Sequence, residues 1–228
     1  MSDPSRGQVS SSQLSGNDVN TSSSSTSVAD RLDRADIAAA TWRPVDIIVT
    51  SAIAVAFGVV FWAWNTLWSA TSGAFTAFPP AQAVLYGVWL VPAVLAPLIV
   101  QRRGAAVYAE LVAAIVSAIL GTQWGLTVLL YGLAQGAAAE IVFAFALYRS
   151  WRLGTALIAG AMAGAAAALV DLVMYYSSWS GAWQITYVAI VAASALVIAG
   201  VGSWLLVRAM ARTGVLAPFP SGADQTRI

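Results

Sequence analysis

The chain has 228 residues, of which 59% are hydrophobic and only 9% are charged, and its mean hydropathy is +0.76. A soluble domain has roughly a quarter of its residues charged, so this composition excludes a soluble protein and indicates a membrane protein. The chain has no Cys and no His, and all 11 of its basic residues are Arg. The absence of Cys and His excludes the common zinc and haem sites, thiol chemistry and a Ser-His-Asp triad. The absence of Lys excludes a nucleotide-binding P-loop, which needs a lysine.

The net charge is +1, and no dense basic cluster occurs along the chain. Nucleic-acid binding draws much of its affinity from basic side chains that neutralise phosphates, so no nucleic-acid partner is expected. We likewise expect no catalytic residue, no metal site and no cofactor.

Residues 1–43 differ in composition from the rest of the chain. The stretch SSSQLSGNDVNTSSSSTS has too few large apolar side chains to offset the entropy lost on ordering, so a disordered, Ser-rich cytoplasmic segment is predicted. It also lacks the apolar core of a signal peptide. Residues 31–40 fit either a short helix at the membrane surface or a solvated linker, and we favour the linker.

Apolar stretches long enough to cross a bilayer recur from Val45 onward. Pro92 and Pro97 remove backbone donors from the second stretch, which is therefore expected to be kinked or partly unwound. The pattern predicts an all-α membrane protein with a six-transmembrane-helix bundle over residues 44–208, followed by a flexible cytoplasmic tail at 209–228. The expected spans are residues 45–67, 82–100, 104–120, 124–148, 154–176 and 184–207.

Arginine placement predicts the orientation, because Arg beside a span stays preferentially on the cytoplasmic side. With six spans, all the arginine clusters that flank them fall on one side, and the loops on the other side carry no charge. Both termini are therefore expected in the cytoplasm, and the protein is expected to cross the bacterial plasma membrane several times. The clusters are Arg43, Arg102 with Arg103, Arg149 with Arg152, and Arg208 with Arg212.

Three acidic side chains lie well within the expected spans: Glu110, Glu140 and Asp171. Each would cost at least ~2.5 kcal/mol if it faced lipid, so each is expected to face the bundle interior. Helical periodicity places Asp171 beside Tyr175, where it either contacts a cationic ligand or accepts a hydrogen bond from another helix. Glu110 and Glu140 lie on stripes of small residues nearer the cytoplasmic end, and both a polar contact between helices and a proton relay are open there.

Aromatic and amide side chains gather in the outer half of the expected bundle. They suit a flat, nitrogen-rich ring, because aromatic rings stack on it while amides and carboxylates bind its edge. The aromatic belt at the membrane surface is the alternative, although it explains Trp62 and Trp89 poorly because both lie deeper. The candidate binding residues are Trp62, Asn65, Tyr86, Trp89, Gln123, Trp124, Tyr131, Gln135, Glu140, Asp171, Tyr175 and Tyr187.

Small residues recur at four-residue spacing in the first and fifth spans. Such spacing lets two helix backbones approach closely. The patterns either pack this bundle internally or dock another membrane subunit. They are Ala52-xxx-Ala56, Ala54-xxx-Gly58 and Gly160-xxx-Gly164-xxx-Ala168.

Several strings in the membrane part resemble the YkoE family of S components. They are FGVVFWAWN at 57–65, GAAVYAEL at 104–111, GTQWG at 121–125, and YGLAQGAAAEIVF at 131–143 followed by Tyr148-Arg149. S components are the substrate-binding subunits of energy-coupling-factor (ECF) transporters, and this family is associated with thiamine or its hydroxymethylpyrimidine (HMP) precursor. The resemblance covers roughly residues 42–210 and is looser in the last two spans.

The resemblance implies a six-helix subunit that captures its vitamin on the extracellular side. It also implies a transmembrane coupling subunit and cytoplasmic ATPase subunits as partners, with ATP hydrolysis confined to those partners. The alternative is a proton-coupled secondary transporter or small channel that uses Glu110, Glu140 and Asp171, although the two halves show no convincing inverted repeat. An intramembrane enzyme is disfavoured because no plausible nucleophile and base occur together. Thiamine and HMP both stay open at this point.

Overall fold

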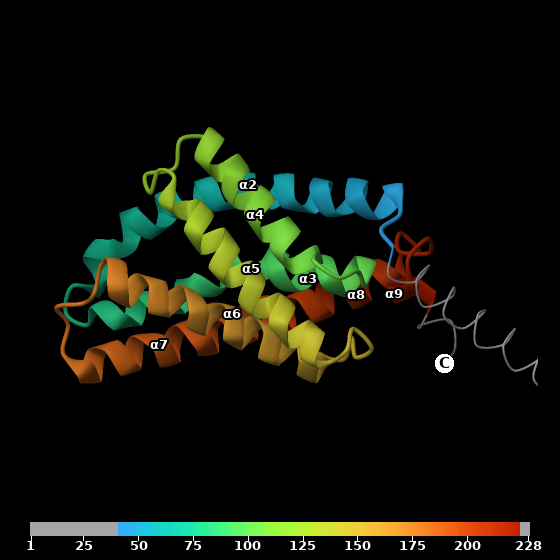
Figure 1. Ribbon diagram of the computed structural model, residues 1–228. Helices are drawn as coiled ribbons and strands as arrows, with labels where there is room; N and C mark the ends of the chain where they lie inside the picture. Colours follow the sequence, from blue (N-terminus) through green and yellow to red (C-terminus); the bar gives the residue numbers. More distant parts are fainter. Residues whose placement is uncertain (1–40, 224–228) are drawn as a thin grey trace, which may run out of the picture. The chain divides into compact units, whose positions relative to one another are not determined.

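The computed structural model of the protein describes residues 41–223 (Figure 1). The predicted N-terminal segment lies outside the described residues except for its last three, and so do the last five residues of the predicted tail. The described part of the chain contains helices and no strand. The elements are α2 (Pro44–Thr71), η1 (Ser72–Phe75), η2 (Pro79–Leu90), α3 (Val91–Val100), α4 (Ala105–Ile119), α5 (Thr127–Phe145), α6 (Leu153–Met174), α7 (Gly181–Ala195), η3 (Leu196–Val201), α8 (Gly202–Arg212) and α9 (Pro220–Ala223).

Within the described residues, five continuous helical stretches are long and apolar enough to cross a membrane, and α4 is a shorter apolar helix of 15 residues. Figure 1 shows α4 and α5 crossing the bundle obliquely. The five stretches and α4 together occupy the expected spans, which confirms the predicted all-α membrane bundle. The five are Pro44–Phe75, Pro79–Val100, Thr127–Phe145, Leu153–Met174 and Gly181–Arg212.

The second span is irregular, as its prolines predicted. It runs as a 3-10 helix in η2 and becomes α-helical only at Val91. Pro97 lies inside α3, and Gln101 ends that helix with a φ of 54°. In its most apolar window 78% of the residues are buried, against 22% for the first span. The irregular backbone therefore lies inside the protein, where other protein groups can pair with its polar atoms.

Two glycines bring α6 into backbone contact with the last span. A Cβ atom added at Gly160 would lie 2.7 Å from the Ala195 carbonyl oxygen, and one added at Gly164 would lie 2.7 Å from the Ala195 Cβ. Only residues without a side chain allow so close an approach. The small-residue pattern was interpreted either as internal packing or as a docking site for another subunit. Gly160 and Gly164 serve internal packing.

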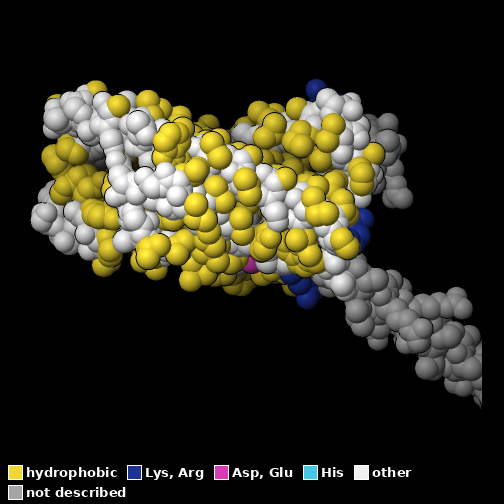
Figure 2. All heavy atoms as spheres, turned by 90° about the horizontal axis from the view of Figure 1, so that it is seen from above, with side chains coloured by type: hydrophobic (Ala, Val, Ile, Leu, Met, Phe, Trp, Pro, Cys, Tyr) yellow, Lys and Arg dark blue, Asp and Glu magenta, His cyan; other side chains and the backbone are white. Residues whose placement is uncertain are grey.

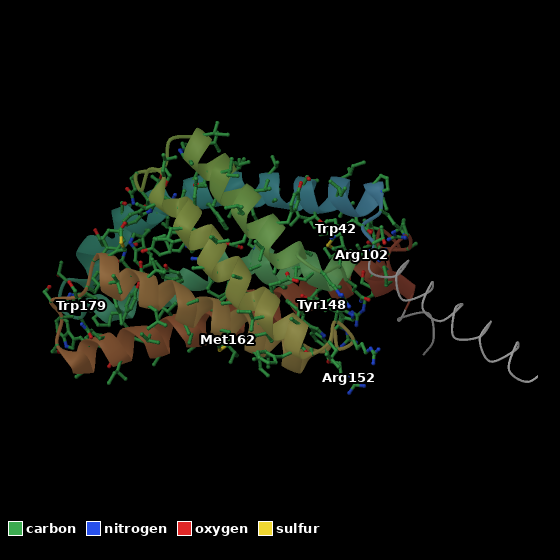
Figure 3. All side chains as sticks on the ribbon, viewed as in Figure 1. Trp42, Arg102, Tyr148, Arg152, Met162 and Trp179 are labelled. Atoms are coloured by element: carbon green, nitrogen blue, oxygen red, sulfur yellow. The ribbon has the colours of Figure 1, made fainter. Side chains whose placement is uncertain are left out.

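The arginines gather at one end of the bundle. Figure 3 labels Arg102 and Arg152 at the end opposite Trp179. In Figure 2 the visible face is largely hydrophobic, and dark blue appears only towards one end. The sequence predicted this arrangement, because with six spans all the arginine clusters fall on the same side of the bundle.

Asp46 joins the arginine clusters of two spans. Its carboxylate lies 2.8 Å from the Arg43 guanidinium and 2.7 Å from that of Arg102. The hydrogen bond to Asp46 raises the pKa of Arg43. Arg43 also donates to the carbonyl oxygen of Pro218 at 3.3 Å, so the first span is connected to the C-terminal segment.

Residues 209–223 differ from the flexible tail that was expected there. The helix α8 continues to Arg212, and the following segment folds back on the end of α3. Leu216 and Phe219 are buried there, and the Ser221 hydroxyl donates to the Ile99 carbonyl oxygen at 2.9 Å. The segment is ordered because these apolar side chains cover a helix end that would otherwise stay exposed.

Gly160→Ala should destabilise the protein, because the added methyl group would collide with backbone atoms of Ala195 and Gly200 that cannot move aside. Overpacking of this kind costs typically ~1–3 kcal/mol, so the midpoint of thermal unfolding in detergent should fall. Gly154→Ala is the matched control in the same helix, since nothing lies within 4 Å of its added Cβ. Equal midpoints for the two variants would contradict the close packing of α6.

Candidate functional site

A cavity of about 290 Å³ lies between α2, η2, α4, α5, α6 and α7. Small-molecule pockets span roughly 300–1,000 Å³, so this cavity suits a ligand of one or two small rings. Its lining is mostly aromatic: Phe61, Trp68, Tyr86, Trp89, Trp124, Tyr131, Tyr175, Tyr176 and Tyr187. The rest of the lining consists of Asn65, Glu110, Ala114, Ser117, Val128, Gly132, Gln135 and Asp171.

The cavity lies towards the end of the bundle that carries no arginine. Tyr176, on its wall, stacks on Trp179 with ring centroids 4.1 Å apart. Figure 3 labels Trp179 at the end opposite Tyr148 and Arg152. Most of the candidate residues from the sequence line the cavity: Asn65, Tyr86, Trp89, Trp124, Tyr131, Gln135, Asp171, Tyr175 and Tyr187. The other three lie elsewhere.

Trp62 lies outside the cavity, with 44% of its surface exposed. The buried stripe of α2 instead carries Phe61, Asn65 and Trp68, spaced i, i+4 and i+7. Trp62 follows Phe61 by one residue, a rotation of about 100° around the helix, and so falls on the outer side. The prediction grouped it with Asn65 because residues three apart are also neighbours on a helix surface.

Glu140 lies at the arginine-bearing end, outside the cavity. Its carboxyl group accepts hydrogen bonds from the backbone N–H groups of Gly104 and Ala106 and from the Tyr148 hydroxyl, the last at 2.8 Å. Burial and this hydrogen bond raise the pKa of Tyr148 to about 12. Glu140 therefore caps the N-terminus of α4, a polar contact between helices.

Asn65 connects α2 to the second span and to the loop after α4. Its amide nitrogen donates to the Thr122 hydroxyl at 2.7 Å, and its amide oxygen accepts from the Trp89 indole at 3.0 Å. Gln123 in the same loop also lies outside the cavity, like Trp62 and Glu140. Its amide oxygen accepts a hydrogen bond from the Ser69 hydroxyl at 2.7 Å. These bonds hold the Trp89 ring in the wall and the loop against α2.

Asp171 lies on the cavity wall between two tyrosine hydroxyls. One carboxyl oxygen accepts from Tyr131 at 2.6 Å and the other from Tyr187 at 2.7 Å. The side chain is only 6% exposed. Asp171 therefore connects α5, α6 and α7. Because each carboxyl oxygen can accept two hydrogen bonds, Asp171 can still accept a hydrogen bond from a ligand in the cavity.

The aromatic side chains of the wall contact one another in two groups. The Trp89 ring centroid lies 5.1 Å from that of Trp68 and 5.2 Å from that of Tyr86. Trp124 and Tyr175 pair on the other side with centroids 5.9 Å apart. Ring faces carry partial negative charge, and two acidic side chains but no Arg occur among the lining residues. The described cavity therefore favours a flat ligand with positive charge or several N–H donors.

Sequence reasoning missed some of the wall. Phe61 and Trp68 share the helical face of Asn65, so the periodicity could have found them. Glu110 and Ser117 were assigned to a stripe for helix contact, and the cavity shows that the same stripe also lines a space. Tyr176 is the last residue of the expected span 154–176, but α6 already ends at Met174, so helical periodicity does not give the direction of its side chain.

The fold is similar to that of a solved structure titled "Crystal structure of an S-component of ECF transporter". The two match with a TM-score of 0.78 and 28% sequence identity, over 82% of this chain and 94% of the other. The fold therefore defines the class of S components, which are transporter subunits and not enzymes.

The chain belongs to the family described as "ABC-type cobalt transport system, permease component", whose model matches residues 45–166. It is also 31% identical over 112 residues to YkoE of Bacillus subtilis (strain 168), which is named as an HMP/thiamine permease protein. That match covers 49% of this chain, and the chain spans about half of YkoE, 55% of its length. The predicted resemblance to YkoE-type S components is thus confirmed, and with the apolar helices it identifies a multi-pass protein of the cell membrane.

Tyr187→Phe should destabilise the protein, because it removes the hydroxyl that pairs with one oxygen of the buried Asp171 carboxyl. Leaving such an acceptor unsatisfied costs ~1–3 kcal/mol, which should lower the midpoint of thermal unfolding. Tyr175→Phe is the control, since its 43% exposed side chain donates no hydrogen bond to another described residue. An unchanged midpoint for Tyr187→Phe would show that Asp171 does not need this donor.

Proposed function

We propose that this chain is the substrate-binding membrane subunit of an ECF-type ABC vitamin importer, and that it captures thiamine or HMP from outside the cell. The observation that carries the proposal is the cavity of about 290 Å³, with its aromatic lining and its acidic groups. The relative YkoE is named for the same two compounds.

The chemistry of these compounds matches the cavity. Both contain an aminopyrimidine, a flat ring with an amino donor and ring nitrogens, and thiamine adds a positively charged thiazolium ring. Stacking on Trp89, Trp124 and Tyr175 supplies contact area for such rings. Asp171 supplies a hydrogen-bond acceptor and attracts the positive charge.

An organic ring suits this cavity better than the cobalt of the family description. Cobalt binds imidazole, thiolate and carboxylate ligands, and the chain has no His and no Cys. Among residues 41–223, no three acidic side chains cluster closely enough to hold a metal ion. The nine aromatic side chains of the lining can stack on an organic ring, whereas aromatic rings are not among the usual ligands of cobalt.

The proposed orientation places both termini and the arginine-bearing end in the cytoplasm, following the positive-inside rule. Residues 44–208 form the transmembrane domain in this proposal. The cavity, towards the opposite end, then faces the outside, as capture of an external vitamin requires. The proposed partners are a transmembrane coupling subunit and cytoplasmic ATPase subunits, which supply the phosphate-binding lysine that this chain lacks.

Binding to the purified protein tests the proposed substrate. Calorimetry should detect thiamine, HMP or both, and should detect neither riboflavin nor the isolated thiazole half. Trp124→Ala should weaken binding by ~1–3 kcal/mol, the usual contribution of one stacked aromatic ring. Trp62→Ala is the control, because Trp62 lies outside the cavity and its loss should leave affinity unchanged. Equal effects of the two variants would place the ligand elsewhere.

The source of energy separates the proposed function from a proton-coupled transporter. In cells that lack any coupling ATPase, this subunit alone should not sustain uptake of labelled thiamine, and coexpression of coupling and ATPase subunits should restore it. The alternative expects the opposite result: uptake without ATPase subunits that stops when the proton gradient is dissipated.

A further inference from the structure

Glu110 carries a polar atom that the bundle leaves without a partner. Its side chain is fully buried and lines the cavity. One carboxyl oxygen accepts from the backbone N–H of Ala93 at 2.9 Å. The other has no hydrogen-bond partner among the described residues. An unsatisfied buried oxygen is costly and rare, so this one points to a ligand group that completes it.

Gln135 presents a second free polar group on the same wall. It is 4% exposed, lines the cavity, and forms no hydrogen bond with another described residue. Its neighbours Gly132 and Gly136 hold α5 against α4 at Glu110. A Cβ added at Gly132 would lie 3.2 Å from the Glu110 carbonyl oxygen, and one added at Gly136 would lie 3.2 Å from the Glu110 Cβ. The amide and the carboxyl group therefore belong to neighbouring parts of the wall.

Asp171 differs from this pair, because both of its oxygens already accept hydrogen bonds from tyrosines. Glu110 has an unused acceptor, and Gln135 has an unused donor and acceptor. An aminopyrimidine presents the matching edge: an amino group that donates and an adjacent ring nitrogen that accepts. A carboxyl oxygen beside an amide can bind both.

We propose that Glu110 and Gln135 form the polar subsite that recognises the hydrogen-bonding edge of the ligand. The Glu110 oxygen accepts from the amino group of the ring, and the Gln135 amide donates to the neighbouring ring nitrogen. This inference rests on the proposed function and adds residues and a binding direction to it. The shared aminopyrimidine lies deep, at α4 and α5, and the part that distinguishes thiamine from HMP lies towards Trp124 and Tyr175.

The test is calorimetry on the full-length protein in detergent with thiamine and HMP as probes. Glu110→Gln should weaken the binding of both compounds by about tenfold, as expected when a buried hydrogen bond between ligand and protein is lost. Glu140→Gln is the matched control: that acid also caps a helix N-terminus but lies outside the cavity. It should lower thermal stability and change the dissociation constants less than twofold.

Two further measurements keep the test valid if Glu110→Gln does not fold. Gln135→Met, which keeps the length of the side chain and removes its amide, should weaken both compounds several-fold. A thiamine analogue with a carbonyl oxygen in place of the ring amino group should bind the wild-type protein at least about tenfold more weakly than thiamine.

The outcomes separate the subsite from the proposed function. If the wild-type protein binds neither thiamine nor HMP, the proposed function fails and the subsite fails with it. If the wild-type protein binds them but a folded Glu110→Gln variant binds as tightly, or if the oxygen analogue binds as well as thiamine, only the subsite is overturned.

Discussion

The pairing of backbone N–H groups at helix starts inside an apolar bundle is the constraint on which the rest of this structure depends. The first N–H groups of a helix have no partner within it, and lipid offers none. Three of the four acidic side chains in residues 41–223 serve this purpose, one for each of α2, α3 and α4. Asp46 accepts from the N–H of Arg43, Glu110 from that of Ala93, and Glu140 from those of Gly104 and Ala106. Asp171 differs from these three, because the hydrogen bonds of its carboxyl group come from the side chains of Tyr131 and Tyr187 and not from a backbone N–H.

The same constraint sets the shape of the cavity wall. Because Glu110 caps α3, the preceding segment can stay in the 3-10 conformation instead of continuing as an α-helix. In a 3-10 helix, side chains three residues apart align along one side, so Tyr86 and Trp89 both face the cavity and contact each other. An α-helix would turn them about 60° apart. One buried acid thus pairs with a backbone N–H at a helix start, beside the segment that carries two aromatic rings of the wall, and keeps one oxygen without a partner among the described residues.

Much of this arrangement could be predicted from the sequence, because spans, breaks and prolines are local signals. The irregular second span was predicted correctly, and most of the candidate aromatic residues line the cavity. Periodicity gives the direction of a side chain around its own helix but not what lies opposite. Trp62 and Phe61 were therefore hard to separate, and the small-residue stripe with Glu110 could be assigned to helix contact although it also borders a space. The ordered segment after Arg212 depends on contacts with α2 and α3, distant in sequence, which no local pattern encodes.

The contact between Arg43 and Pro218 has a consequence for biosynthesis. These residues are 175 positions apart, so the first span enters the bilayer long before the segment that completes its arginine-bearing end has been made. Until then Asp46 can pair with the arginines already synthesised, but the end of α3 lacks its cover of Leu216 and Phe219. Synthesis of the segment after Arg212, and not insertion of the last span, is therefore the event that closes this end of the molecule.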